Sequence, residues 1–89
     1  MQVQTNETLL RELHRVDSVN RARASLGYFI NAAKDAAPGS KTYLYNLSMS
    51  GEIVAIRRYN ESIVRLARVC RRAELDFSSV LLENNITLI

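Results

Sequence analysis

The stretch "AAPGSK", residues 36–41, contains the only proline of the chain and one of its three glycines. Proline followed by glycine is a strong turn signal, and Ser40 is well suited to cap a helix that begins after it. On both sides of this turn, apolar residues recur in alternating steps of three and four, the repeat of helices packed along a narrow seam. The stretch therefore predicts a turn between two long helices.

These helices are predicted at residues 6–37 and 41–73, as an antiparallel pair, because a short connection makes neighbouring helices antiparallel. The seam positions of the first helix are Leu9, Glu12, Val16, Val19, Arg23, Leu26, Ile30, Ala33 and Ala37. Those of the second helix are Tyr45, Met49, Glu52, Ile56, Tyr59, Ile63, Leu66, Cys70 and Ala73. Counting outward from the turn predicts a contact between Arg23 and Glu52; the alternative is that both side chains reach solvent.

The C-terminal stretch "LDFSSVLLENN", residues 75–85, predicts a short third helix. Asp76 is expected to cap this helix, and Asn84 and Asn85 are expected to end it. The final "ITLI" is apolar, and we expect it to dock on the body of the protein or on a neighbouring subunit.

Residues 42–59 also allow an alternative β-hairpin, because "TYLYNLSM" alternates like a strand and "IVAIRRY" is rich in β-branched residues. The seam that continues through Gly51 favours a helix instead. The predicted fold class is therefore all-α, with residues 1–89 forming one domain: an antiparallel two-helix hairpin plus a short C-terminal helix.

Two helices cannot bury all the apolar surface that this sequence carries. Several large apolar side chains lie off the seam: Tyr28, Phe29, Leu44, Leu47, Ile53 and Val64. Self-association into a four-helix dimer or a larger ring covers them most simply. The protein is thus expected to be a homo-oligomer that forms a helical bundle.

Several classes of protein are disfavoured by the composition. The single cysteine, Cys70, excludes an internal disulfide and fits a reducing compartment. The N-terminus lacks the pattern of a signal peptide, and no run of about 18 apolar residues predicts a membrane span. One histidine, His14, has no nucleophile placed beside it, and no metal-ligand or phosphate-loop motif is present. We expect a cytoplasmic protein that is not an enzyme, with no metal and no cofactor.

Arginine supplies ten of the twelve basic residues in a chain of net charge +3. Arginine favours bidentate contact with carboxylate or phosphate. One stripe of the second helix, opposite the seam, carries Arg58, Arg65, Arg68 and Arg72, with Glu61 among them. Because the helices are antiparallel, Arg11 and Arg15 of the first helix are predicted to lie near residues 65–72. The simpler alternative is a solvated face.

The start of the second helix offers another place for an anion. Lys41 follows Ser40 there, and the free backbone N–H groups at a helix N-terminus favour negative charge. Tyr43 is close enough in sequence to stack on a base; the alternative is that it fills the end of the bundle. The candidate ligand-binding residues are Lys41, Tyr43, Arg65, Arg68, Arg72, Arg11 and Arg15.

Two resemblances to known families bear on function. The stretch "VCRRAELDFSSVLLE", residues 69–83, resembles the core of a helix-turn-helix, with Cys70, Leu75 and Val80 at its packing positions. That resemblance implies a DNA-binding regulator that uses residues 66–83, with Ser78, Ser79, Arg71 and Arg72 facing DNA. The sequence departs from the pattern in having Glu74 where glycine is usual and Glu83 where an apolar residue closes the unit.

The segment "AAPGSKTYLYNLSMSGE", residues 36–52, resembles the small phage helical-hairpin proteins that sequester cyclic nucleotide signals of bacterial immunity. The shared features are the turn of Pro38, Ser40 and Lys41 and the following Leu47-Ser48; the departure is the run from Met49 to Gly51, where a more polar stretch is expected. The resemblance implies a nucleotide ligand held between subunits by basic and aromatic side chains.

The preferred prediction is an oligomer that captures an anionic ligand, either a small molecule such as a nucleotide messenger or a nucleic acid. A protein-binding inhibitor or adaptor, with a host protein as its partner, stays open as a third class.

Overall fold

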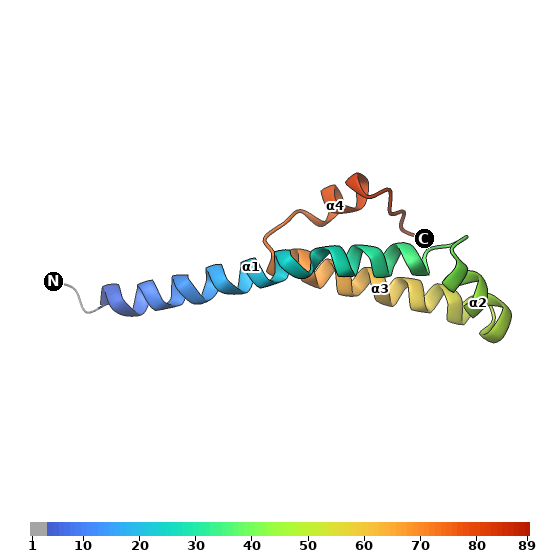
Figure 1. Ribbon diagram of the computed structural model, residues 1–89, viewed down its shortest axis with the longest axis horizontal. Helices are drawn as coiled ribbons and strands as arrows, with labels where there is room; N and C mark the ends of the chain where they lie inside the picture. Colours follow the sequence, from blue (N-terminus) through green and yellow to red (C-terminus); the bar gives the residue numbers. More distant parts are fainter. Residues whose placement is uncertain (1–3) are drawn as a thin grey trace.

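The computed structural model describes residues 4–89, and within that range the protein is built of helices without strands. The helices are α1 (Gln4–Ala36), α2 (Lys41–Ser50), α3 (Glu52–Arg72) and α4 (Phe77–Glu83). In Figure 1, α3 runs back along the C-terminal half of α1, while α4 and the tail fold over this pair. The predicted all-α class is confirmed, and the β-hairpin alternative for residues 42–59 is wrong.

The turn after α1 forms where the sequence predicts it. Gly39 has a φ of +91°, a backbone conformation that glycine adopts without steric cost. Ser40 then caps α2, because its hydroxyl oxygen accepts a hydrogen bond from the backbone N–H of Tyr43 at 3.1 Å. The predicted turn and its cap are therefore confirmed.

The prediction of one continuous helix over residues 41–73 is wrong, because Gly51 divides this segment into α2 and α3. Gly51 has φ +88° and ψ 172°, a region open essentially to glycine alone. The break folds α2 back onto α3, where the buried side chain of Asn46 accepts a hydrogen bond from Arg58 Nη1 at 2.9 Å. Helical periodicity continues through residue 51, but the backbone does not.

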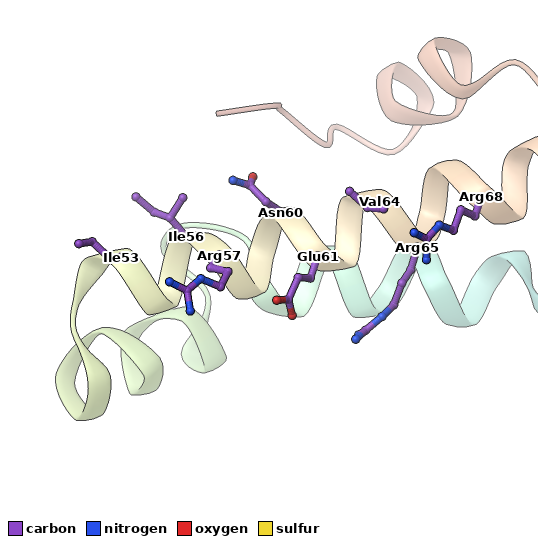
Figure 2. Close-up of a pocket in the computed structure, with 8 residues that line it drawn as sticks. All are labelled: Ile53, Ile56, Arg57, Asn60, Glu61, Val64, Arg65 and Arg68. Carbon is purple, nitrogen blue, oxygen red and sulfur yellow. The ribbon is translucent and has the colours of Figure 1, made fainter.

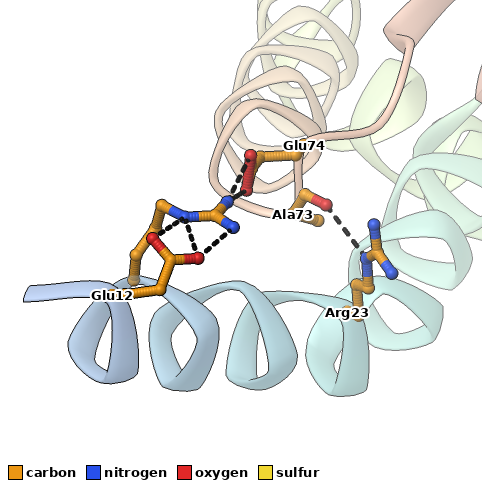
Figure 3. Close-up of polar contacts among 5 residues, drawn as sticks. Glu12, Arg23, Ala73 and Glu74 are labelled. Atoms are coloured by element: carbon orange, nitrogen blue, oxygen red, sulfur yellow. Dashed lines mark hydrogen bonds and ion pairs between the residues drawn. The ribbon is translucent and has the colours of Figure 1, made fainter. Parts of the chain in front are cut away.

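This break also overturns the predicted contact between Arg23 and Glu52. Arg23 Nε instead donates to the backbone carbonyl of Ala73 at 3.0 Å, at the far end of α3 (Figure 3). Glu52 is exposed in the first turn of α3, where the helix dipole favours an acid. The reason is geometric: α2 belongs to the connection between the packed helices, so α3 pairs with α1 in a shifted register.

The core lies between the C-terminal half of α1, the inner face of α3 and the C-terminal segment. The seam from Tyr59 to Ala73 is buried as predicted, and Leu66 and Cys70 are fully enclosed. Val80 and Leu81 of α4 pack against this seam together with Ile86, and the largest buried cluster consists of Ala33, Tyr59, Ile63, Leu66, Cys70, Val80, Leu81 and Ile86. By contrast, Tyr45 and Met49, on the same predicted seam, are exposed because α2 turns away.

The C-terminal helix and tail follow the sequence-based prediction. Asp76 caps α4 by accepting hydrogen bonds from the backbone N–H of Ser79 at 3.0 Å and from its hydroxyl at 2.7 Å. The tail then returns to α3, where Tyr59 donates its hydroxyl proton to the carbonyl of Thr87 at 2.6 Å. Ile86 is buried in the core cluster, so the tail docks on the body of its own chain at this residue, whereas Leu88 and Ile89 are exposed.

The N-terminal part of α1 extends alone past the end of α3 (Figure 1). The protein is consequently elongated, with principal extents of 66 × 24 × 17 Å. Every residue from 6 to 18 is exposed. Residues 4–14, called the arm below, precede Arg15, which contacts Glu74 beyond the end of α3.

Candidate anion-binding groove

Three basic side chains that form no ion pair with any described residue lie on the outer face of α3, the side opposite the core. A shallow groove of about 530 Å³ runs along this face. It is lined by Ile53, Ile56, Arg57, Asn60, Glu61, Val64, Arg65 and Arg68 (Figure 2). These positions recur in steps of three and four, so one helical face supplies the whole lining.

Three guanidinium groups make the groove cationic. Arg57, Arg65 and Arg68 are exposed, and within residues 4–89 none of them forms an ion pair. Figure 2 shows Arg65 and Glu61 extending to the same side of α3, without an ion pair between them. Each guanidinium offers five N–H donors in a planar fork that matches a carboxylate or a phosphate.

The groove also has an apolar component. Ile53 is 76% exposed and Val64 is 48% exposed, while Ile56 is half-buried between them. Large apolar side chains on a helix exterior leave water-contacting surface that a bound partner removes. The groove therefore suits a ligand that carries both negative charge and apolar surface.

The candidate arginines predicted from sequence are distributed over different places. Arg65 and Arg68 line the groove, whereas Arg72 lines a smaller hollow of about 280 Å³ between α1 and α3, together with Arg21. Arg11 is exposed on the arm and does not line the groove. The structure thus brings two of these residues together and leaves the others outside.

Arg15 is occupied by two carboxylates. It donates to Glu12 at 2.7 Å and to Glu74 at 2.7 Å, which ties the arm's base to the turn that follows α3 (Figure 3). The hydrogen bond and the charge of Arg15 lower the pKa of Glu12. In turn, the hydrogen bond and the charge of Glu12 raise the pKa of Arg15. This guanidinium is already neutralised, so it contributes little to anion binding.

Lys41 and Tyr43 also lie outside the groove lining. The backbone N–H of Tyr43, which an anion at the start of α2 would need, is bonded to the Ser40 hydroxyl. The same cap that starts the helix therefore consumes one of the donors predicted for a ligand.

Two groove residues, Arg57 and Asn60, were missed by the sequence-based prediction. Their signal was present, because Arg57, Glu61, Val64 and Arg68 share one helical face at spacings of four and three. Arg58 was predicted on the basic stripe, but its guanidinium is bonded to Asn46 of α2. Only the fold-back at Gly51 creates that contact, so residue spacing alone does not reveal it.

Among the described residues, no three His, Cys, Asp or Glu side chains gather as a metal site would require, and no helix is long and apolar enough to cross a bilayer. Burial raises the pKa of the Cys70 thiol, which is enclosed in the core. In comparisons with known proteins, no family model, curated protein or solved structure matches the chain.

Proposed function

We propose that the protein is a self-associating, non-enzymatic binding protein whose α3 groove captures an anionic ligand. The observation that carries this proposal is the groove itself, where Arg57, Arg65 and Arg68 present free guanidinium groups beside exposed Ile53 and Val64. Hydrogen bonds between guanidinium and phosphate or carboxylate are charge-assisted and often bidentate. An apolar neighbour adds affinity for the uncharged part of the same molecule.

A nucleotide fits these two requirements. Its phosphates match the arginine forks, and its base has a flat face that stacks on apolar side chains or on a guanidinium plane. The resemblance of residues 36–52 to phage proteins that sequester cyclic nucleotide signals makes a cyclic dinucleotide the first ligand to test. The groove supports this choice by its charge and its apolar lining.

A DNA-binding regulator is the second candidate, since α3 and α4 are joined by a short turn in which Glu74 has a φ of +56°. That backbone conformation is the one for which glycine is usual in the helix-turn-helix resemblance. However, α4 and the tail carry no lysine or arginine, and residues 73–89 contain three carboxylates. Since phosphate contacts dominate DNA affinity, this segment is poorly suited to enter a groove of DNA.

The test compares two pairs of charge reversals. Arg65→Glu with Arg68→Glu reverses two of the three groove cations, while Arg71→Glu with Arg72→Glu reverses the basic pair outside the groove. Calorimetry with a cyclic dinucleotide is expected to show binding by the wild type and the second variant but not by the first. Each lost charge-assisted bond contributes about 1.5–3 kcal/mol, roughly tenfold or more in affinity.

The same variants distinguish DNA binding. Duplex DNA would bind more weakly as salt rises from about 50 mM to about 200 mM, and Arg71→Glu with Arg72→Glu would abolish that binding. Circular dichroism of each variant establishes that the helices are intact. Unchanged nucleotide binding by the Arg65→Glu and Arg68→Glu variant would contradict the proposed site.

A further inference from the structure

The hollow of about 280 Å³ between α1 and α3, called the interhelix hollow below, is separate from the α3 groove. It is lined by Ser18, Arg21, Ala22, Ser25, Phe29, Val69 and Arg72. None of these residues lines the groove. The α1 members are spaced by three or four residues and share one helical face, and the two α3 members are three residues apart. The hollow therefore exists only because these two faces meet.

Two arginines and a serine supply hydrogen-bond donors to the interhelix hollow. Arg72 is exposed and, within residues 4–89, forms no ion pair. Arg21 belongs to α1, so the two planar guanidinium forks come from different helices. The exposed Ser18 hydroxyl adds a third donor. The Ser25 hydroxyl already donates to the carbonyl of Ala22 at 2.9 Å, so its proton is not available to a ligand.

The floor of the interhelix hollow is apolar. Ala22 and Val69 are buried there, while Phe29 is half-buried, so part of its ring stays open to the hollow. Tyr28 packs edge-on against Phe29, with ring centroids 5.2 Å apart. Aromatic rings attract one another in edge-on and offset arrangements. A planar aromatic ligand can therefore pack on the open part of the Phe29 ring.

The charges around the interhelix hollow leave it cationic. Residues 13–34 of α1 contain one acid, Asp17, and residues 62–72 of α3 contain none. The Asp17 carboxylate lies 3.1 Å from Arg21 Nη2, but both side chains are mostly exposed, and exposed ion pairs contribute little. Glu74, in the turn after α3, is paired elsewhere and lines a different hollow. Two guanidinium groups therefore face one weakly held carboxylate.

We infer that the interhelix hollow is a second anion site, which takes the phosphomonoester group of a small aromatic molecule. A phosphomonoester carries about −1.5 to −2 charge at pH 7 and three acceptor oxygens, enough for both guanidinium forks at once. A carboxylate has fewer oxygens and a single charge. The volume lies just below the range of about 300–1,000 Å³ typical of ligand pockets, which favours a small molecule over a dinucleotide. This inference goes beyond the proposed function, because it concerns a different surface.

The test is calorimetry of phenyl phosphate binding to the full chain, in a buffer free of phosphate. Arg71→Gln is the matched control for Arg72→Gln, since Arg71 is exposed and lines neither the interhelix hollow nor the groove. We expect Arg72→Gln and Arg21→Gln each to raise the dissociation constant about tenfold or more. Arg71→Gln should change it by less than about twofold, because screening weakens distant charges. Equal weakening by Arg71→Gln and Arg72→Gln, or a wild type that does not bind phenyl phosphate, would overturn the inference.

Asp17→Asn is expected to change the affinity in the opposite direction. The substitution releases Arg21 and removes the only nearby negative charge of α1. Phenyl phosphate should therefore bind about two- to fivefold more tightly. A variant that merely disturbs the helices cannot produce this gain, so the result stands even if Arg21→Gln perturbs α1. Unchanged or weaker binding by Asp17→Asn would show that the phosphate does not lie at Arg21.

Three related probes separate the chemistry of the ligand. Inorganic phosphate lacks the ring, methyl phenyl phosphate is a diester with a single charge, and benzoate carries a carboxylate in place of the phosphate. Each is expected to bind more weakly than phenyl phosphate. Inorganic phosphate that bound as tightly would remove the aromatic part of the inference, and a diester or benzoate that did so would remove the phosphomonoester. Arg21→Gln should keep the binding of a cyclic dinucleotide, because Arg21 does not line the α3 groove.

Discussion

Gly51 and Gly27 provide a matched pair of glycine substitutions with opposite expected signs. Both glycines have open space where a Cβ would be placed, so neither change produces a steric clash. Gly51 has φ +88° and ψ 172°, whereas Gly27 lies within α1. The difference between Gly51→Ala and Gly27→Ala therefore reports the backbone conformation and not the packing.

The expected magnitudes follow from these conformations. Gly51→Ala forces a side chain into a region open essentially to glycine, which costs about 1–3 kcal/mol. Gly27→Ala removes a poor helix former from an exposed helical position and should stabilise the protein by about 0.8–1 kcal/mol. For a domain of this size, each kcal/mol shifts the melting temperature by about 4–8 °C.

The assay is urea unfolding followed by circular dichroism, with the wild type and both variants at the same protein concentration. We expect the midpoint to rise for Gly27→Ala and to fall for Gly51→Ala. A Gly51→Ala variant as stable as the wild type, with greater helical signal, would refute the reasoning. It would mean that α2 and α3 join into one continuous helix at no cost.

Three further predictions concern the core and the C-terminal segment. Tyr59→Phe removes the hydrogen bond to Thr87, so we expect a loss of about 0.5–1.5 kcal/mol and faster amide exchange in residues 84–89; unchanged exchange there would contradict the docking of the tail. Cys70 is fully buried and its pKa is raised, so a thiol reagent should modify it only after unfolding; rapid modification of the native protein would show the core to be open. Hydrogen bonds from the Ser79 hydroxyl and then from its backbone N–H lower the pKa of Asp76 below 3.8, so the contribution of this cap is complete above pH 3.8 and is lost as the pH falls through the lowered value; an Asp76→Ala variant should lack this acid-dependent step, and an unchanged acid transition would contradict it.

Residue spacing predicted a minor part of the candidate site, because only two of the seven candidate residues, Arg65 and Arg68, line the groove. Arg65 and Arg68 were found because they lie opposite the apolar seam of their own helix, a property that is local in sequence. Lys41 and Tyr43 do not line the groove. The sequence predicts a free helix N-terminus at these residues, but the Tyr43 N–H already donates to the Ser40 hydroxyl. Arg57 was overlooked although its spacing matched.

The sequence by itself determined the local structure of this protein. The turn at residues 36–41, the α4 cap at Asp76 and the buried face of α3 follow from neighbouring residues, since proline, glycine, capping side chains and apolar spacing act over one or two helical turns. Only the tertiary structure decided the break at Gly51, the pairing of Arg23 with Ala73 and the solitary arm. A periodic apolar stripe specifies which face of a helix is buried, but the partner and the register depend on contacts between residues far apart in the chain.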